Sequence, residues 1–236
     1  MEKVFKVLIF TDLDGSLLHR DTFKFDEIKD YLIKLISKGI FIIPNSSKTE
    51  REILEFINDL GSSLPFISEN GAAINGLDLL NANFPKKLIL SREKANLLNI
   101  FKNTVPKNLQ NKCKWLSDMD KKKQSLIFGL RDKKLSMALD RQYTIPFLFE
   151  GTKNEKNELS KIIKNQDLYL QEGGRVINLT DKINKANALR VFVRFFKKDN
   201  IDVKTIAVGD NYNDLNMLKT SDFPCLVFND KFTLDK

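Results

Sequence analysis

The sequence predicts an α/β protein, in which a core domain built on a parallel sheet carries an inserted α+β domain. Two observations support this fold class. Short apolar segments alternate with segments whose apolar residues recur at helical spacing, which is typical of a parallel sheet covered by helices on both faces. This rhythm changes near residue 80 and returns after residue 178. We therefore predict the core domain at 1–79 and 173–236 and the inserted domain at 80–172.

The N-terminal part of the core is predicted to contain three strands and two helices. Each strand segment is short and apolar, and each helix segment is closed by a glycine. The second helix can be capped by Ser47 or Thr49. The strands are expected at 4–10, 40–43 and 65–67, and the helices at 25–37 and up to residue 60. The loops that leave the strands are polar, at 12–15, 46–49 and 69–71.

The same patterns predict the elements of the inserted domain and of the C-terminal part. In the inserted domain, helices are expected at 92–102, 135–141 and 155–163, and strands at 126–130, 146–150 and 168–170. The lysine run 121–123 is predicted to lie in a turn between two strands. The core then resumes with a helix at 185–197, a strand at 205–208, a helix at 213–218 and a strand at 224–228.

Composition excludes several classes of protein. Two cysteines without metal-ligand spacing argue against a disulfide scaffold or a zinc site. No apolar run reaches the ~20 residues of a membrane helix, so we expect a cytoplasmic protein with no membrane partner. The formal net charge is +8, but the lysines are scattered among acidic residues, so we expect no nucleic-acid partner. This charge balance suits an enzyme with a small anionic substrate.

Paired carboxylates follow two predicted strands that lie far apart in the sequence. Asp12 and Asp14 follow the first strand, and Asp210 and Asp214 follow the strand at 205–208. Taken alone, each loop is more typical of a turn than of a metal site. If both strands lie centrally in one parallel sheet, however, their loops meet at the same edge. A few hard oxygen ligands with room for water and a phosphate suit Mg²⁺.

The order of these motifs resembles that of the haloacid dehalogenase-type phosphatases, which have a Rossmann-like core. Asp12-Leu13-Asp14-Gly15-Ser16 is similar to their first motif, and Gly209-Asp210-Asn211-Tyr212-Asn213-Asp214 is similar to their fourth. Between them, Ser46 matches the second motif and Lys185 the third. By themselves, Ser46 could begin a helix and Lys185 could be a surface lysine. Their place in the order favours the catalytic interpretation.

The resemblance implies an aspartyl-phosphate mechanism. Asp12 would be the nucleophile, and Asp14 would protonate the leaving alkoxide and later take a proton from water. Ser46 and Lys185 would donate hydrogen bonds to the phosphoryl oxygens.

The resemblance also implies a ligand set for Mg²⁺. The ion would contact the Asp12 carboxylate, the main-chain carbonyl of Asp14 and the Asp210 carboxylate. Asn213 and Asp214 would hold metal-bound waters.

Three further stretches resemble the mannosyl-3-phosphoglycerate phosphatases within this superfamily. They are Pro44-Asn45-Ser46-Ser47-Lys48-Thr49, Arg141-Gln142-Tyr143-Thr144-Ile145-Pro146-Phe147 and Gly173-Gly174-Arg175. In the second stretch Thr144-Ile145 replaces the Ser-Glu of the family, and Asn178 stands where a histidine is common. The resemblance implies substrate contacts from Lys48, Thr49, Arg141, Gly173, Gly174 and Arg175. Arginine can clamp a carboxylate or a phosphate, although Arg141 and Arg175 could also be structural ion-pair partners.

The expected function is hydrolysis of mannosyl- or glucosyl-3-phosphoglycerate to the glycosylglycerate, a compatible solute, and phosphate. Residues 80–172 would form the cap domain of such an enzyme. The alternatives are another sugar-phosphate phosphatase, a phosphohexomutase with the same motifs, or an inactive binding module. We expect a monomer or a weak homodimer.

Overall fold

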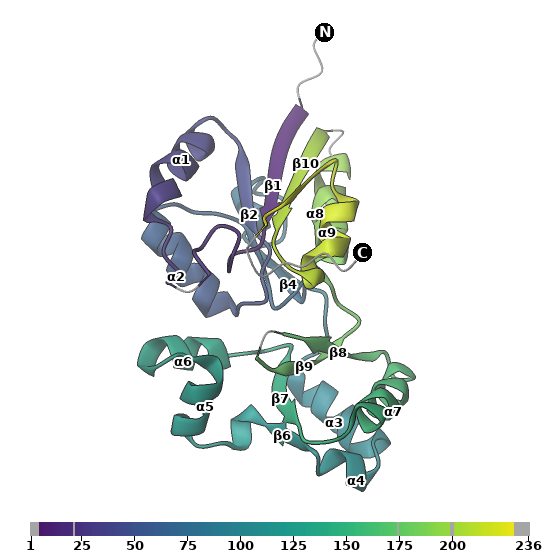
Figure 1. Ribbon diagram of the computed structural model, residues 1–236. Helices are drawn as coiled ribbons and strands as arrows, with labels where there is room; N and C mark the ends of the chain where they lie inside the picture. The colour runs from purple at the N-terminus through teal and green to yellow at the C-terminus, as the bar shows by residue number, and fades with distance from the viewer. Residues whose placement is uncertain (1–4, 21, 174, 199–200, 229–236) are drawn as a thin grey trace. The chain divides into compact units, whose positions relative to one another are not determined.

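The chain divides into two compact units (Figure 1). The computed structural model describes residues 5–20, 22–173, 175–198 and 201–228. The core comprises residues 1–90 and 184–236, and the insert comprises 91–183. Both boundaries lie further along the chain than the predicted 80 and 172. The reason is strand pairing, because β5 (Lys87–Ile89) pairs within the core and β9 (Ile177–Asp181) pairs within the insert.

In the described part of the chain, the core is built on a parallel sheet of four strands, in the order β11-β10-β1-β2. Thr11, at the end of β1, pairs with Val208 of β10 and with Pro44 of β2. The three strands therefore end at the same level, and the loops that follow them leave one edge of the sheet. The strands are β1 (Phe5–Thr11), β2 (Phe41–Pro44), β10 (Asp202–Gly209) and β11 (Phe223–Leu226).

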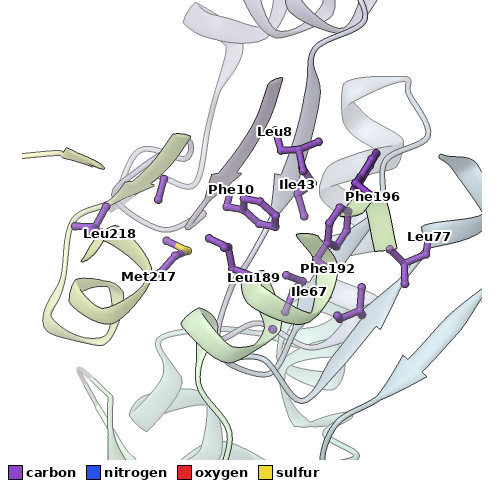
Figure 2. Close-up of a cluster of buried hydrophobic side chains, with 13 residues drawn as sticks. Leu8, Phe10, Ile43, Ile67, Leu77, Leu189, Phe192, Phe196, Met217 and Leu218 are labelled. Atoms are coloured by element: carbon purple, nitrogen blue, oxygen red, sulfur yellow. The ribbon is translucent and has the colours of Figure 1, made fainter. Parts of the chain in front are cut away.

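Helices cover both faces of this sheet, as Figure 1 shows. Neighbouring residues of a strand point to opposite faces. Ile42 accordingly packs with helices α1 and α2, whereas Ile43 joins the cluster of α8 and α9. In that cluster the ring of Phe10 meets Phe192 edge-on, with centroids 5.3 Å apart (Figure 2). The helices are α1 (Asp26–Ser37), α2 (Glu50–Leu60), α8 (Lys185–Lys198) and α9 (Leu215–Thr220).

A small antiparallel sheet completes the core, in the order β3-β4-β5. The strand predicted at 65–67 therefore exists, but it forms a hairpin. One parallel bridge, between Asn45 and Ile67, joins it to the segment after β2. The remaining elements are β3 (Phe66–Ser68), β4 (Ala73–Asn75) and the short helices η1 (Leu77–Leu79) and η3 (Tyr212–Asp214).

The insert has its own antiparallel sheet, in the order β6-β7-β9-β8, and its own apolar core. Leu97, Phe101, Phe147 and Leu159 are among the residues that this core buries. Its strands are β6 (Cys113–Trp115), β7 (Ile145–Phe149), β8 (Leu168–Glu172) and β9. Its helices are α3 (Lys94–Thr104), α4 (Lys107–Gln110), η2 (Leu116–Asp118), α5 (Lys121–Phe128), α6 (Asp132–Leu139) and α7 (Lys153–Lys164).

Helix α5 replaces both the predicted turn at 121–123 and the predicted strand at 126–130, so both predictions are wrong. The Asp120 side chain caps the helix by accepting a hydrogen bond from the Lys123 amide at 2.9 Å. Leu126 is 85% exposed, so the apolar run that suggested a buried strand is not buried. Within the described ranges, no helix has the length and apolar character needed to cross a membrane.

Candidate active site

Three polar loops of the core carry the candidate site at the carboxyl edge of the sheet. Asp12 directly follows the central strand β1, and its amide donates to the carbonyl of Val208 on β10 at 2.9 Å. Because β10 is the neighbour of β1 and ends at the same level, Asp210 emerges beside Asp12. The two acidic loops therefore lie side by side, as the sequence predicts.

Asp12, Asp210 and Asp214 form a compact acidic group. One carboxylate oxygen from each lies within 4.8 Å of the others, and all three side chains are buried. Arg20 adds a positive charge at the rim, with its guanidinium 3.6 Å from Asp210 Oδ2. Such a group of oxygen atoms has the composition that hard divalent cations prefer.

Lys185 neutralises part of this charge from inside the fold. Its side chain is 1% exposed, and its Nζ lies 2.8 Å from Asp12 Oδ1 and 2.6 Å from Asp214 Oδ1. Lys185 opens α8, where the Asn184 side chain accepts a hydrogen bond from the Asn187 amide at 2.8 Å. The buried side chain of Asn45 donates to the Lys185 carbonyl at 3.1 Å and so ties the start of α8 to the end of β2.

Asp214 organises the loop after β10. Its Oδ2 accepts hydrogen bonds from the amides of Asp210 at 3.2 Å and Asn211 at 3.1 Å, while its Oδ1 faces Lys185. Both oxygens therefore contact groups of the protein. Asn213 lies on the exposed side of η3.

Burial and mutual repulsion shift the pKa values of these groups. Burial raises the pKa of Asp210 to about 6, and the neighbouring carboxylates of Asp12 and Asp214 add to the shift. Burial alone would lower the pKa of Lys185, but the same two carboxylates raise it above its ordinary value. Lys185 therefore stays charged, whereas the pKa of Asp210 stays raised even though the charges of Arg20 and Lys185 oppose the shift.

Asp14 faces a different cation. Its Oδ2 lies 2.9 Å from Lys48 Nζ. Burial raises the pKa of Asp14 above its ordinary value, and Lys48 opposes that shift. The predicted substrate contact Thr49 caps α2, where its hydroxyl accepts from the Glu52 amide at 3.3 Å. Lys48 and Thr49 thus contact protein groups within the core.

Ser46 is buried between two loops. Its amide donates to the Ile67 carbonyl at 3.1 Å, its carbonyl accepts from the Asn70 amide at 2.9 Å, and its hydroxyl accepts from the Lys48 amide at 3.3 Å. The loop predicted at 69–71 therefore supports Ser46. Sequence reasoning missed Arg20 and Asn45 as neighbours of the predicted catalytic residues. Arg20 lies outside every motif, whereas the position of Asn45 beside Ser46 could have drawn attention to it.

The other predicted substrate contacts belong to the insert and are described within it. Arg141 donates to the Ala138 carbonyl at 3.2 Å and to the Thr144 hydroxyl at 2.9 Å. The guanidinium of Arg175 lies against Gly129, where an added Cβ would come 2.6 Å from Nη1. Gly173 is exposed. Gly174 lies outside the described residues.

The sheet, the acidic group and the buried lysine together define a haloacid dehalogenase-like hydrolase. The family model for these hydrolases matches residues 9–233, and the chain belongs to this family.

Curated relatives and a solved structure add detail. The chain is 30% identical to the glucosyl-3-phosphoglycerate/mannosyl-3-phosphoglycerate phosphatase of Methanococcoides burtonii. The matched region has 231 residues and covers 94% of this chain and 85% of the relative. It is 26% identical to the mannosyl-3-phosphoglycerate phosphatase of Pyrococcus horikoshii, over 91% of this chain and 88% of the relative. A phosphatase of the HAD superfamily from Bacteroides thetaiotaomicron has a TM-score of 0.67 at 18% identity, over 94% of this chain and 83% of that one, which supports the fold.

Proposed function

We propose that this protein is a Mg²⁺-dependent phosphomonoesterase that hydrolyses glucosyl- or mannosyl-3-phosphoglycerate. The observation that carries the proposal is the contact of Lys185 with Asp12, at 2.8 Å, inside a buried group of three carboxylates. A carboxylate nucleophile and a cation fixed beside it are what phosphoryl transfer requires. The substrate class is that of the two curated relatives.

The acidic group fits a divalent cation. Asp12 and Asp210 would hold it, because both oxygens of Asp214 already contact protein groups. A bound Mg²⁺ would reduce the repulsion between the attacking carboxylate and the phosphate. Asp214 would keep the loop after β10 in place, and Asn213 would help to hold metal-bound water.

The first half of the reaction transfers the phosphoryl group to the protein. An oxygen of Asp12 attacks phosphorus and the bond from phosphorus to the ester oxygen breaks, leaving its electron pair on that oxygen. Asp14 gives its proton to the ester oxygen, so the product leaves as an alcohol. Lys185 and Ser46 donate hydrogen bonds to the phosphoryl oxygens, whose charge grows in the transition state.

The second half releases phosphate. Asp14, now ionised, takes a proton from a water molecule while the water oxygen attacks phosphorus. The bond between phosphorus and Asp12 breaks, and its electrons restore the carboxylate. Protons balance over the cycle, because Asp14 ends in the protonated form in which it began.

The experiment that tests this function is a measurement of phosphate release. Purified protein with Mg²⁺ is given mannosyl- and glucosyl-3-phosphoglycerate together with hexose phosphates, and the substrates are ranked by kcat/KM. We expect the glycosyl phosphoglycerates to rank first. Asp12→Asn should abolish turnover, whereas Asp59→Asn, on the exposed side of α2, should not change it.

Other results would point to the alternatives. A higher kcat/KM for simple hexose phosphates would contradict the substrate class but keep the reaction. Phosphate that moves within a hexose without release would indicate a phosphohexomutase. Turnover that survives in Asp12→Asn would contradict the mechanism.

A further inference from the structure

Lys48 is held by protein groups on three sides. Its Nζ lies 2.9 Å from Asp14 Oδ2, 3.8 Å from Glu52 Oε1 and 5.0 Å from the centroid of the Phe23 ring. The side chain is 15% exposed. Glu52 is fixed in turn, because its Oε2 accepts hydrogen bonds from the amide and the hydroxyl of Thr49 at 2.9 and 3.1 Å. These contacts fix the ammonium group of Lys48 within the core.

The two oxygens of Asp14 have different surroundings. Lys48 contacts Oδ2, whereas Oδ1 is buried and has no hydrogen-bond partner among the described residues. A buried carboxylate oxygen without a donor costs free energy unless another group supplies a partner. The contact with Lys48 therefore fixes the carboxyl group by one oxygen and leaves the other without a partner among the described residues.

We propose that Lys48 is a positioning residue, which orients Asp14 so that Oδ1 faces the oxygen of the leaving group. This inference rests on the proposed phosphatase function. It assigns to Lys48 a role different from the direct substrate contact that the sequence predicts. The main chain supports this role, because the Lys48 amide donates to the Ser46 hydroxyl at 3.3 Å and so links Asp14 to the predicted phosphate contact.

The consequence concerns the leaving group. An alkoxide leaves poorly without a proton, whereas a nitrophenolate leaves without one. A carboxyl group that has lost its orientation should therefore slow attack on alkyl phosphates and spare attack on aryl phosphates. The quantity to compare is kcat/KM, because it covers the steps up to departure of the leaving group and excludes the later hydrolysis of the aspartyl phosphate.

The experiment compares Lys48→Met with the wild-type protein, both with Mg²⁺, on glucosyl-3-phosphoglycerate and on p-nitrophenyl phosphate. We expect kcat/KM to fall about 10- to 100-fold on the alkyl phosphate, a part of the ~10²–10⁴-fold that a general acid contributes. On the aryl phosphate we expect a fall of less than about threefold. Lys48→Arg, which keeps the charge, should recover most of the loss.

Two controls separate this role from a structural or a binding one. Lys87→Met removes an ion pair with Glu50, at the start of the same helix α2 but outside the site, and should leave the ratio of the two kcat/KM values unchanged. Calorimetry in the inactive Asp12→Asn background should give the same substrate Kd with and without Lys48→Met.

Three outcomes would overturn the inference. Equal losses on both phosphates would indicate a structural role. A Kd that rises tenfold or more would make Lys48 a substrate contact. A wild-type protein that releases phosphate from neither compound would refute the proposed function and the inference together, whereas the first two results would leave the function intact.

Discussion

Asp210 connects the protonation state of the site with the stability of the fold. Its pKa is raised to about 6, first by burial and then by the charges of Asp12 and Asp214, whereas an aspartate in an unfolded chain has a pKa of about 3.9. The folded state therefore holds a proton that the unfolded state releases. This contribution to stability is complete below about pH 4 and is lost as the pH rises through about 6.

We predict that the metal-free wild-type protein loses stability relative to Asp210→Asn between pH 4.5 and pH 7.5. The expected relative loss in the free energy of unfolding is roughly 1 to 2 kcal/mol, less than the full shift implies, since water screens part of the repulsion. Urea denaturation in the presence of EDTA, at a series of pH values, measures it. Parallel curves for the two proteins would show that Asp210 is not the group that titrates.

The residues that touch phosphate and metal in the proposal could be predicted from the sequence, because their motifs have a fixed order and lie at strand ends. The structure brings Asp12, Asp210 and Lys185 together as expected. Their supports could not be predicted in the same way. The contact of Lys48 with Asp14, and that of Asn45 with the Lys185 carbonyl, depend on side-chain rotamers and on loop packing.

The start of helix α8 is held by a close approach of two main chains. Gly71 has φ +100°, and a Cβ at this position would come 2.4 Å from the Asn184 carbonyl oxygen, one residue before Lys185. We predict that Gly71→Ala lowers kcat about 10- to 100-fold, because the helix that carries Lys185 must shift. It should also destabilise the fold by about 2–4 kcal/mol, through strain and overpacking. Phosphate release and urea denaturation measure the two effects.

Gly61→Ala is the matched control for this substitution. Gly61 ends α2 with φ +73°, but an added Cβ would meet no atom of the described residues within 4 Å. We expect a loss of about 1 kcal/mol from backbone strain alone and an unchanged kcat. If the two variants lost the same activity, the position of α8 would not depend on Gly71.

Elements that pack on a sheet were easier to predict than elements that do not. Helix α2 was predicted with a cap at Ser47 or Thr49, of which the structure has Thr49, and with its terminal Gly61, because its apolar face is buried and its capping residues are regular. Helix α5 was mistaken for a turn and a strand. Its apolar residues do not mark a buried face, since Leu126 is 85% exposed, and the cap at Asp120 was overlooked.

The fold class of the whole molecule could be predicted from the alternation of strands and helices. The first and last residues of the insert could not be predicted in this way. Strand β5 is short and partly exposed, so its pairing with β4 left no clear pattern in the sequence. The missed strand β9 pairs with β7 and β8. Each unit nevertheless has an apolar core of its own.

The insert meets the requirements for folding alone. Among the described residues, its core draws on seven helices and strands, which include α3, α7, β7 and β9. Its two ends are joined by Arg92, whose amide and Nε donate to Asp181 Oδ2 at 2.8 and 2.9 Å and whose Nη2 donates to Oδ1 at 2.8 Å. Chain entry and exit therefore lie side by side, as expected for a domain inserted into another.

We predict that residues 91–183, produced alone, unfold cooperatively in urea and keep the helical circular dichroism of a folded α+β domain. Arg92→Met should lower the free energy of unfolding of this fragment by about 1–2 kcal/mol, since charge-assisted hydrogen bonds between its ends are lost at a partly exposed site. Lys114→Met removes the more exposed pair with Glu150, at 3.6 Å, and should cost less than about 0.5 kcal/mol. A fragment without a cooperative transition would mean that the insert depends on the core for its stability, and equal losses in the two variants would mean that the Arg92 contact does not hold the ends together.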